Sequence, residues 1–147
     1  MIKMVRMETT SGVRSRRRRV LLAEDNRDER HMYSSRMREA GWQVDEIESG
    51  AGALEAAVAG MPDVVITDLT MPGMDGAEAT RILKTDPRTR NIPVIVLSGF
   101  PERSYEAYRA GCHTFLSKPC LVETLLEIMD AMGREEAPSP PSRTGGG

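Results

Sequence analysis

Carboxylate, hydroxyl and ammonium side chains stand directly after four of the apolar runs in this 147-residue sequence. Glu24 and Asp25 follow the first run, Asp68 follows the third, and Ser98 and Lys118 follow the last two. A divalent ion such as Mg²⁺, which prefers oxygen ligands, would relieve the repulsion among three carboxylates. A metal ion held by carboxylates beside an ammonium and a hydroxyl group suits phosphoryl transfer, because positive charge stabilises the phosphoryl oxygens while one carboxylate attacks.

The elements that would position these groups alternate between short apolar runs and helical segments. We expect strands at residues 20–23, 43–47, 63–67, 93–97 and 113–116, and helices at residues 28–40, 52–59, 76–85, 102–110 and 121–132. The last helix should bury one face, formed by Leu121, Leu125, Ile128 and Met132. This (βα)5 pattern predicts an α/β fold with a doubly wound, five-stranded parallel sheet and helices on both faces. Ligands of such sheets bind beyond the carboxyl ends of the strands.

The sequence divides into three parts by composition and charge. Residues 1–19 contain seven Lys/Arg and one Glu and show no helical or strand period, which predicts a disordered basic arm. Residues 20–133 form the predicted domain, and residues 134–147, rich in Pro and Gly, form a predicted flexible tail. Because the whole chain carries −2 and the tail is neutral, the domain itself carries −8.

The charge balance and the apolar runs exclude some classes of protein. An acidic body argues against a nucleic-acid-binding domain. The arginine run from Arg14 to Arg19 could bind nucleic acid or an acidic membrane surface, but a solvated arm is the favoured interpretation. No apolar run approaches the roughly 18 residues that span a bilayer, and no export signal is evident. We therefore expect a cytoplasmic protein.

The segments around these side chains resemble the four signature blocks of response-regulator receiver domains. The similar segments are residues 20–26, 63–76, 94–99 and 115–119, and the resemblance runs from about residue 20 to residue 132. Asp25, Asp68, Ser98 and Lys118 follow one another at intervals of 43, 30 and 20 residues, which also agree. The resemblance implies a flavodoxin-like receiver fold with the strand order 2-1-3-4-5.

The resemblance also implies a phosphoacceptor and a set of metal ligands. Asp68 matches the aspartate that accepts the phosphoryl group and also binds the Mg²⁺ cofactor. Asp25 matches the direct metal ligand, and Glu24 matches the acid that usually holds the ion through water. Thr70 matches the position whose backbone carbonyl coordinates the metal. No organic cofactor is implied.

Three further positions match the residues through which the family responds to phosphorylation. Ser98 matches the hydroxyl that bonds a phosphoryl oxygen, and Lys118 matches the lysine that pairs with the acceptor or its phosphate. Phe115 matches an aromatic residue that turns inward when the hydroxyl moves. Many relatives have Tyr there, and Phe cannot offer a phenol to a partner. Lys118-Pro119 matches a bond that is cis in the family.

These matches favour a phosphorylation-driven switch over an enzyme that acts on a separate substrate. The expected donor is a sensor histidine kinase or a phosphotransfer protein. The expected output is a change of protein partner on the face formed by the fourth helix, the fifth strand and the fifth helix, where Tyr105 and Tyr108 are plausible contacts. No output domain is expected after Met132.

Other functions remain as alternatives. The first is a receiver-fold interaction module that works without phosphorylation, although the complete acidic site argues against it. A phosphatase of the haloacid-dehalogenase type would need a second Asp two residues after Asp68, where this chain has Thr70. A flavodoxin-like FMN carrier is disfavoured because the first strand ends in acids.

Overall fold

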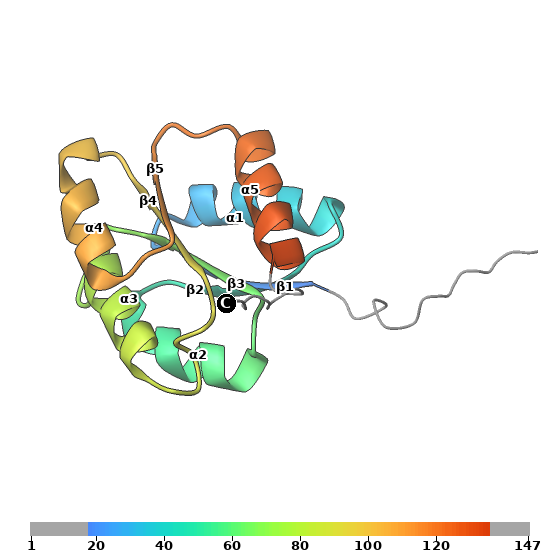
Figure 1. Ribbon diagram of the computed structural model, residues 1–147. Helices are drawn as coiled ribbons and strands as arrows, with labels where there is room; N and C mark the ends of the chain where they lie inside the picture. The colour runs from blue at the N-terminus through green and yellow to red at the C-terminus, as the bar shows by residue number, and fades with distance from the viewer. Residues whose placement is uncertain (1–17, 136–147) are drawn as a thin grey trace, which may run out of the picture.

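The computed structural model describes residues 18–135, which form five strands and five α-helices (Figure 1). The strands are β1 (Arg19–Ala23), β2 (Gln43–Ile47), β3 (Val64–Asp68), β4 (Val94–Ser98) and β5 (Thr114–Ser117). The helices are α1 (Arg27–Glu39), α2 (Ala53–Gly60), α3 (Gly76–Thr85), α4 (Ser104–Ala110) and α5 (Val122–Glu135), with short 3₁₀ turns η2 (Gly50–Gly52) and η3 (Pro101–Arg103). The first strand thus begins one residue before the predicted domain border at residue 20, and the last helix ends two residues after the predicted border at residue 133. Apart from residues 18, 19, 134 and 135, the predicted arm and tail lie outside the described residues.

The strands form one parallel sheet in the order β2-β1-β3-β4-β5, which confirms the predicted fold and strand order. Asp68 at the end of β3 lies in register with Leu97 of β4, and Ser98 at the end of β4 lies in register with Ser117 of β5. The carboxyl ends of the central strands therefore meet at one edge of the sheet, where open α/β sheets bind their ligands.

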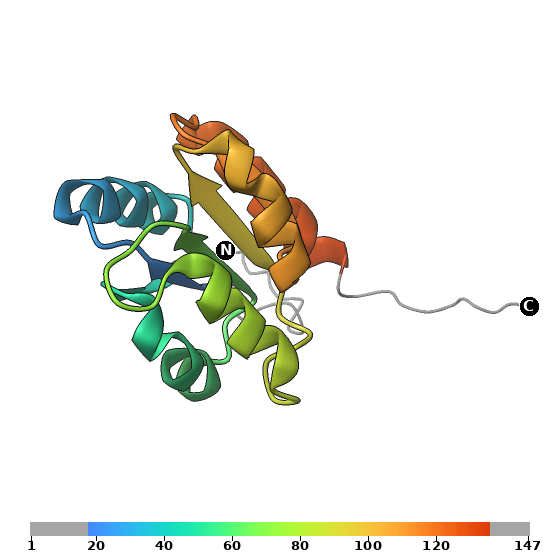
Figure 2. The same cartoon turned by 90° about the vertical axis from the view of Figure 1, so that its left-hand side faces the viewer.

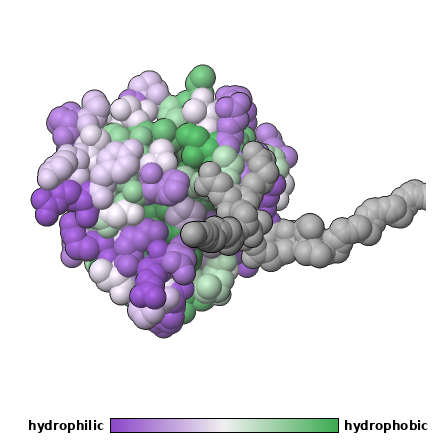
Figure 3. Space-filling model, in the orientation of Figure 1, coloured by the Kyte–Doolittle hydropathy of each residue, from purple (hydrophilic) through white to green (hydrophobic). Residues whose placement is uncertain are grey.

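Helices cover both faces of the sheet, α1 and α5 on one and α2, α3 and α4 on the other (Figures 1 and 2). Successive strand residues point to opposite faces, so Leu22 packs in the layer with α1 and α5, and Leu21 packs in the layer with α2 to α4. Both faces of β3 and β4 are buried throughout. Hydrophilic residues cover much of the outer surface in the view of Figure 3, with hydrophobic residues visible between them. Within residues 18–135, none of the helices combines the length and the apolar character needed to cross a bilayer.

Two helices that begin at the carboxyl edge of the sheet have side-chain caps. The Asn26 side chain accepts a hydrogen bond from the Glu29 N–H at 2.9 Å at the start of α1. The Asp75 side chain accepts one from the Glu78 N–H at 3.0 Å at the start of α3. These caps satisfy N–H groups that have no partner within the helix. They fix where α1 begins after Asp25 and where α3 begins after the loop of residues 69–75, which follows Asp68.

The prediction for the last helix was wrong in one respect. Leu121 was placed on the buried face, but it precedes α5 and its side chain is 71% exposed. The helix begins one residue later, and an adjacent position lies about 100° around a helix of 3.6 residues per turn. The fully buried face of α5 consists of Val122, Leu125, Met129 and Met132, while Ile128 is only partly buried.

Candidate functional site

Three carboxylates meet where β1 and β3 end. Glu24 and Asp25 follow the last residue of β1, and Asp68 is the last residue of β3. One carboxylate oxygen from each of them lies within 4.8 Å of the other two. Glu24 is 1% exposed and Asp68 is 8% exposed, whereas Asp25 is open to solvent. The structure therefore brings together a partly buried group of oxygen ligands that remains accessible from one side.

Backbone and side-chain contacts hold Glu24 in place. Its carboxylate accepts a hydrogen bond from the Asn26 N–H at 3.0 Å, and its main-chain carbonyl accepts one from Arg30 at 2.8 Å. Its N–H donates to the Ile47 carbonyl of β2 at 3.0 Å. Burial raises the pKa of Glu24 to about 6, opposed by the Asn26 hydrogen bond and the Lys118 ammonium and assisted by the charge of Asp68. Positive charge in the site would favour the ionised form.

Asp68 ends β3, and the main chain that follows it is tied to β4. The next residue, Leu69, donates its N–H to the Leu97 carbonyl at 2.8 Å, and the Thr67 hydroxyl donates to the Asp68 carbonyl at 2.9 Å. Burial raises the pKa of Asp68 above its ordinary value, while the Lys118 ammonium and the Thr70 N–H lower it. The carboxylate is thus partly desolvated and compensated by one nearby cation.

That cation, Lys118, lies among three carboxylates. Its Nζ is 3.4 Å from Asp68 Oδ2, 3.2 Å from Glu24 Oε1 and 2.6 Å from Glu29 Oε1. Burial alone would lower the pKa of Lys118, but the Glu29 hydrogen bond and the charges of Asp68 and Glu24 raise it above its ordinary value. Lys118 therefore stays protonated and can stabilise negative charge at the acceptor. The Lys118-Pro119 bond is cis, as expected.

The predicted switch residues lie on the two strands next to β3: Ser98 ends β4, and Phe115 lies in β5. Ser98 is fully buried, and its Oγ accepts a hydrogen bond from the Phe100 N–H at 2.9 Å. The Ser98 carbonyl accepts the Lys118 N–H at 2.7 Å, which ties the end of β4 to the end of β5. Phe115 is partly buried against the layer formed with α2 to α4, and its N–H donates to the Tyr108 hydroxyl at 3.1 Å. β5 thus connects the candidate site with α4.

The residues present fit a hard divalent cation. Mg²⁺ takes oxygen ligands and commonly uses one or two carboxylates together with waters and a phosphate. The cluster of Glu24, Asp25 and Asp68 supplies only oxygen donors, and two of the three carboxylates are largely removed from water. Lys118 supplies one positive charge, whereas the cluster contains three carboxylates. The site can therefore accommodate a cation in addition to Lys118.

Sequence reasoning missed three residues that shape the site. Glu29 makes the shortest of the Lys118 contacts, which depends on the placement of α1 and was not signalled by any spacing in the sequence. Arg103 lies 3.4 Å from the Thr70 hydroxyl and 3.5 Å from the Asp75 carboxylate, and so joins the loops after β3 and β4. Thr70 itself is exposed. Gly76 lies so close to the main chain of Asp68 that a Cβ atom would meet the Asp68 carbonyl oxygen at 2.2 Å, and no residue type or spacing signalled this approach.

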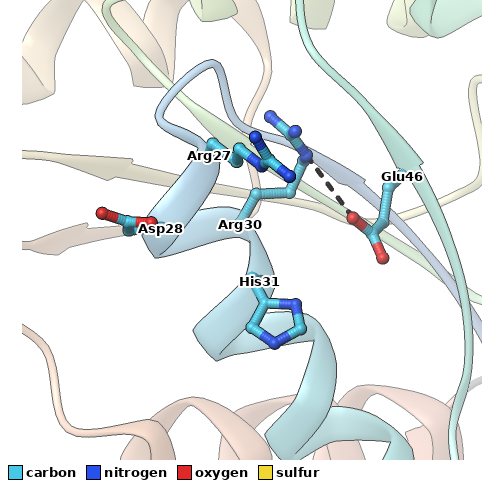
Figure 4. A pocket seen from close by; sticks show the side chains of 5 residues that line it. All are labelled: Arg27, Asp28, Arg30, His31 and Glu46. Atoms are coloured by element: carbon cyan, nitrogen blue, oxygen red, sulfur yellow. Dashed lines mark ion pairs between the residues drawn. The ribbon is translucent and has the colours of Figure 1, made fainter.

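A separate cavity of about 470 Å³ lies beside α1 and β2 (Figure 4). Its lining consists of Arg27, Asp28, Arg30, His31 and Glu46. Arg30 points toward Glu46, and their Nε and Oε1 atoms are 3.4 Å apart. Arg30 also donates to the Glu24 carbonyl, so its ion pair with Glu46 connects the end of β1 with β2. None of the three clustered carboxylates lines this cavity.

Comparisons with known proteins agree with this geometry. A family model described as the response regulator receiver domain matches residues 20–130. The PilH protein of Pseudomonas aeruginosa is 34% identical over 116 residues, which cover 78% of this chain and 96% of that protein. The polar-differentiation response regulator DivK of Brucella ovis is 30% identical over 112 residues, which cover 75% of this chain and 91% of that protein.

Solved structures show the same arrangement of elements. The chemotaxis response regulator CheY4 of Vibrio cholerae has a TM-score of 0.73 and 29% identity, with 80% of this chain and 99% of that chain covered. The receiver domain of a sensor histidine kinase from Pseudomonas aeruginosa has a TM-score of 0.75 and 25% identity, with 81% of this chain and 99% of that chain covered. That domain was crystallised with a magnesium ion coordinated in its active site cleft.

Proposed function

Because the chain belongs to the response regulator receiver domain family, we propose that it accepts a phosphoryl group on Asp68 from a histidine kinase or a phosphotransfer protein. The observation that carries this proposal is the position of Asp68 at the end of β3, within the carboxylate cluster and 3.4 Å from the Lys118 ammonium. A carboxylate in this setting can act as a nucleophile toward phosphorus.

The transfer exchanges one bond to phosphorus for another. A carboxylate oxygen of Asp68 attacks the phosphorus of a phosphohistidine in line with the leaving nitrogen. The new bond joins the Asp68 oxygen to phosphorus, the bond between phosphorus and the imidazole breaks, and the imidazole leaves with its electron pair and takes up a proton. Lys118 stabilises the negative charge on the phosphoryl oxygens, since its ammonium donates hydrogen bonds without transferring a proton.

We further propose that the site uses Mg²⁺. Glu24, Asp25, Asp68 and the Thr70 carbonyl would hold it, with Glu24 acting through water as the family resemblance implies. When bound, the ion supplies positive charge that stabilises the phosphoryl oxygens. The chain's own residues then orient the acceptor: the Leu69 N–H ties the loop to β4, and the nearby Thr70 N–H lowers the pKa of the Asp68 carboxylate.

The output of the switch would pass through Ser98 and Phe115. A phosphoryl oxygen on Asp68 offers the Ser98 hydroxyl a charged acceptor, and charge-assisted hydrogen bonds are stronger than neutral ones. Movement of Ser98 would free space into which Phe115 can repack. Because the Phe115 N–H bonds Tyr108, this repacking would alter the face formed by α4, β5 and α5, where an unidentified downstream protein would bind.

Two further expectations belong to this proposal. The protein would act in the cytoplasm, where the phosphodonor kinases have their catalytic parts. It would be a phosphoacceptor that promotes its own phosphorylation and dephosphorylation and does not turn over a separate substrate.

Acetyl phosphate, which carries an activated phosphoryl group, tests the proposal without a kinase. Intact-protein mass spectrometry of the chain with acetyl phosphate and Mg²⁺ should show the addition of one phosphoryl group, which is lost in Asp68→Asn and on chelation of the metal. Asp45→Asn on β2 makes the same chemical change at a partly exposed acid outside the cluster, and it should leave the addition unchanged. Absence of phosphorylation in the unaltered chain would favour an interaction module that works without phosphorylation.

A further inference from the structure

The shortest of the Lys118 ion pairs joins it to a residue outside the carboxylate cluster. Lys118 Nζ lies 2.6 Å from Glu29 Oε1 in the first turn of α1, and 3.4 Å from Asp68 Oδ2. The first distance is that of a strong charge-assisted hydrogen bond, and the second exceeds the usual range for a hydrogen bond. In this conformation the ammonium is therefore held mainly by Glu29 and Glu24 and only loosely by the acceptor.

Glu29 differs from Glu24 in what its carboxylate does. The Glu24 carboxylate is almost fully buried and belongs to the cluster, so its removal would alter the candidate metal site. The Glu29 side chain is 40% exposed, and its carboxylate contacts Lys118. The cap at the start of α1 depends on the Glu29 main chain instead, whose N–H donates to the Asn26 side chain. Replacement of the Glu29 carboxylate would thus leave the cap and the cluster in place.

We propose that Glu29 is a positioning residue that competes with the phosphorylated acceptor for Lys118. This inference rests on the proposed phosphorylation of Asp68. An ammonium has three N–H donors, and in this structure Lys118 donates hydrogen bonds to Glu29 and Glu24, while Asp68 Oδ2 lies 3.4 Å away as an ion-pair partner. To bond the incoming phosphoryl oxygens, Lys118 must move toward Asp68 and lengthen or break its contact with Glu29. Glu29 thereby favours the unphosphorylated form and slows the transfer.

The consequence is that loss of the Glu29 charge should speed phosphorylation. Glutamine keeps the length and polarity of the side chain but removes the charge. A partly exposed ion pair is worth little, so we expect Glu29→Gln to raise the rate constant for phosphorylation by acetyl phosphate about two- to five-fold. Asp28→Asn is the matched control, because Asp28 is the other acid in the first turn of α1 and, in Figure 4, points away from Arg30 and Glu46.

The kinetic experiment separates the inference from the proposed function. Faster phosphorylation of Glu29→Gln, with an unchanged rate for Asp28→Asn, supports the competition. Equal rates for all three proteins, equal increases in both variants, or a slower Glu29→Gln would overturn it. If the unaltered chain takes up no phosphoryl group at all, the proposed function fails, and the ion pair must be judged by a second measurement.

The lysine signals in nuclear magnetic resonance provide that measurement. The sequence contains three lysines, Lys3, Lys84 and Lys118, so labelling of lysine with ¹³C gives three side-chain Cε signals, and Lys118→Arg assigns one of them. Glu29→Gln should shift the Lys118 signal and leave that of Lys84 in place, while Asp28→Asn should shift neither. An unmoved Lys118 signal in Glu29→Gln would overturn the inference whether or not Asp68 is phosphorylated.

Discussion

Gly76 lies directly against the main-chain carbonyl of Asp68. A Cβ atom on Gly76 would come within 2.2 Å of the Asp68 carbonyl oxygen and 2.9 Å of the Leu69 Cα. The Gly76 N–H also donates to the Leu69 carbonyl at 2.7 Å. The first residue of α3 is therefore packed onto the main chain at the start of the acceptor loop, which consists of residues 69–75 after Asp68, and no space is left for a side chain between them. In this way α3 fixes the main chain of the proposed phosphoacceptor.

This contact predicts that Gly76→Ala displaces the acceptor loop. A methyl group that meets main-chain atoms forces a backbone shift, which costs about 1–3 kcal/mol of the free energy of unfolding. Chemical denaturation measures this loss, and phosphorylation by acetyl phosphate should slow as Asp68 moves. Gly52→Ala is the control, since a Cβ atom on Gly52 would meet no atom within 4 Å and the Gly52 φ of −92° suits alanine. Equal stability of Gly76→Ala and the unaltered chain would contradict the packing argument.

The raised pKa of Glu24 predicts how stability depends on pH without Mg²⁺. The folded chain binds the Glu24 proton more tightly than the unfolded chain does, because the pKa rises from 4.5 to about 6. The stability that this provides is complete below pH 4.5 and is lost as the pH rises through about 6, a loss of about 2 kcal/mol. Glu24→Gln cannot ionise, so it does not lose this stability. Between pH 4.5 and pH 7.5, its free energy of unfolding should therefore rise by about 2 kcal/mol relative to that of the unaltered chain.

Denaturation in buffers from pH 4 to pH 7.5, with metal chelated, measures this difference. Glu55→Gln provides the control, because Glu55 lies exposed on α2 and its replacement makes the same chemical change outside the carboxylate cluster. A difference between Glu24→Gln and the unaltered chain that does not change with pH would show that Glu24 does not titrate abnormally in the folded chain.

The same protonation predicts that Mg²⁺ stabilises the protein more at higher pH. The ion binds ionised carboxylates, and both Glu24 and Asp68 hold their protons more tightly than ordinary acids. The rise in Tm on addition of Mg²⁺ should therefore be small at pH 5 and larger at pH 7.5. Thermal unfolding at the two pH values, with and without the ion, tests this. A rise of the same size at both pH values, or none at either, would count against the metal site.

The Ser98 hydroxyl is predicted to transmit phosphorylation rather than to support it. Ser98→Ala removes the acceptor of the Phe100 N–H and should cost about 1 kcal/mol of stability. Asp68 should still be phosphorylated, but the amide signal of Phe115 should shift less than in the unaltered chain when acetyl phosphate and Mg²⁺ are added. Ser117→Ala, at the exposed position in register with Ser98, should respond as the unaltered chain does. A full Phe115 shift in Ser98→Ala would remove Ser98 from the switch.

The Tyr108 hydroxyl is predicted to protect the main chain of β5. It accepts the Phe115 N–H at 3.1 Å, so Tyr108→Phe should expose that N–H to water and speed its hydrogen exchange, by about five-fold for a net loss of about 1 kcal/mol. Tyr105→Phe is the control, since the Tyr105 hydroxyl bonds the Arg109 side chain instead. Unchanged exchange at Phe115 in Tyr108→Phe would show that another group protects this N–H.

The sequence was sufficient to predict the order of the elements and the edge at which the carboxylates gather. Continuous apolar runs such as 64–66 and 94–97 mark strands that are buried on both faces, and the polar residues that follow such runs lie at the carboxyl edge of the sheet. The strand order itself came from the family resemblance, because alternation of strands and helices does not determine it. The error at Leu121 arose because helix periodicity gives the buried face only once the first helical residue is known, and boundaries are the least certain feature of such patterns.

The contacts within the site were less accessible to sequence reasoning. The carboxylate neighbours of Lys118 include Glu29, which lies on a helix that was predicted correctly but was assigned no role. Its contact depends on how α1 is placed over the end of β5, which local patterns do not encode. The approach of Gly76 to Asp68 depends likewise on the packing of α3, and a glycine at a helix start resembles any other turn residue.

Reduction of the phosphorylated chain with borohydride, followed by peptide mass spectrometry, tests most directly whether Asp68 is the phosphoacceptor. An acyl phosphate is an activated carboxyl group, so hydride converts the modified aspartate to an alcohol and marks the residue that carried the phosphoryl group. If Asp68 is the phosphoacceptor, an alcohol forms at position 68 alone, and its formation depends on both Mg²⁺ and acetyl phosphate. An alcohol at Asp25, at Glu24 or at any other carboxylate, or none at all, would contradict it.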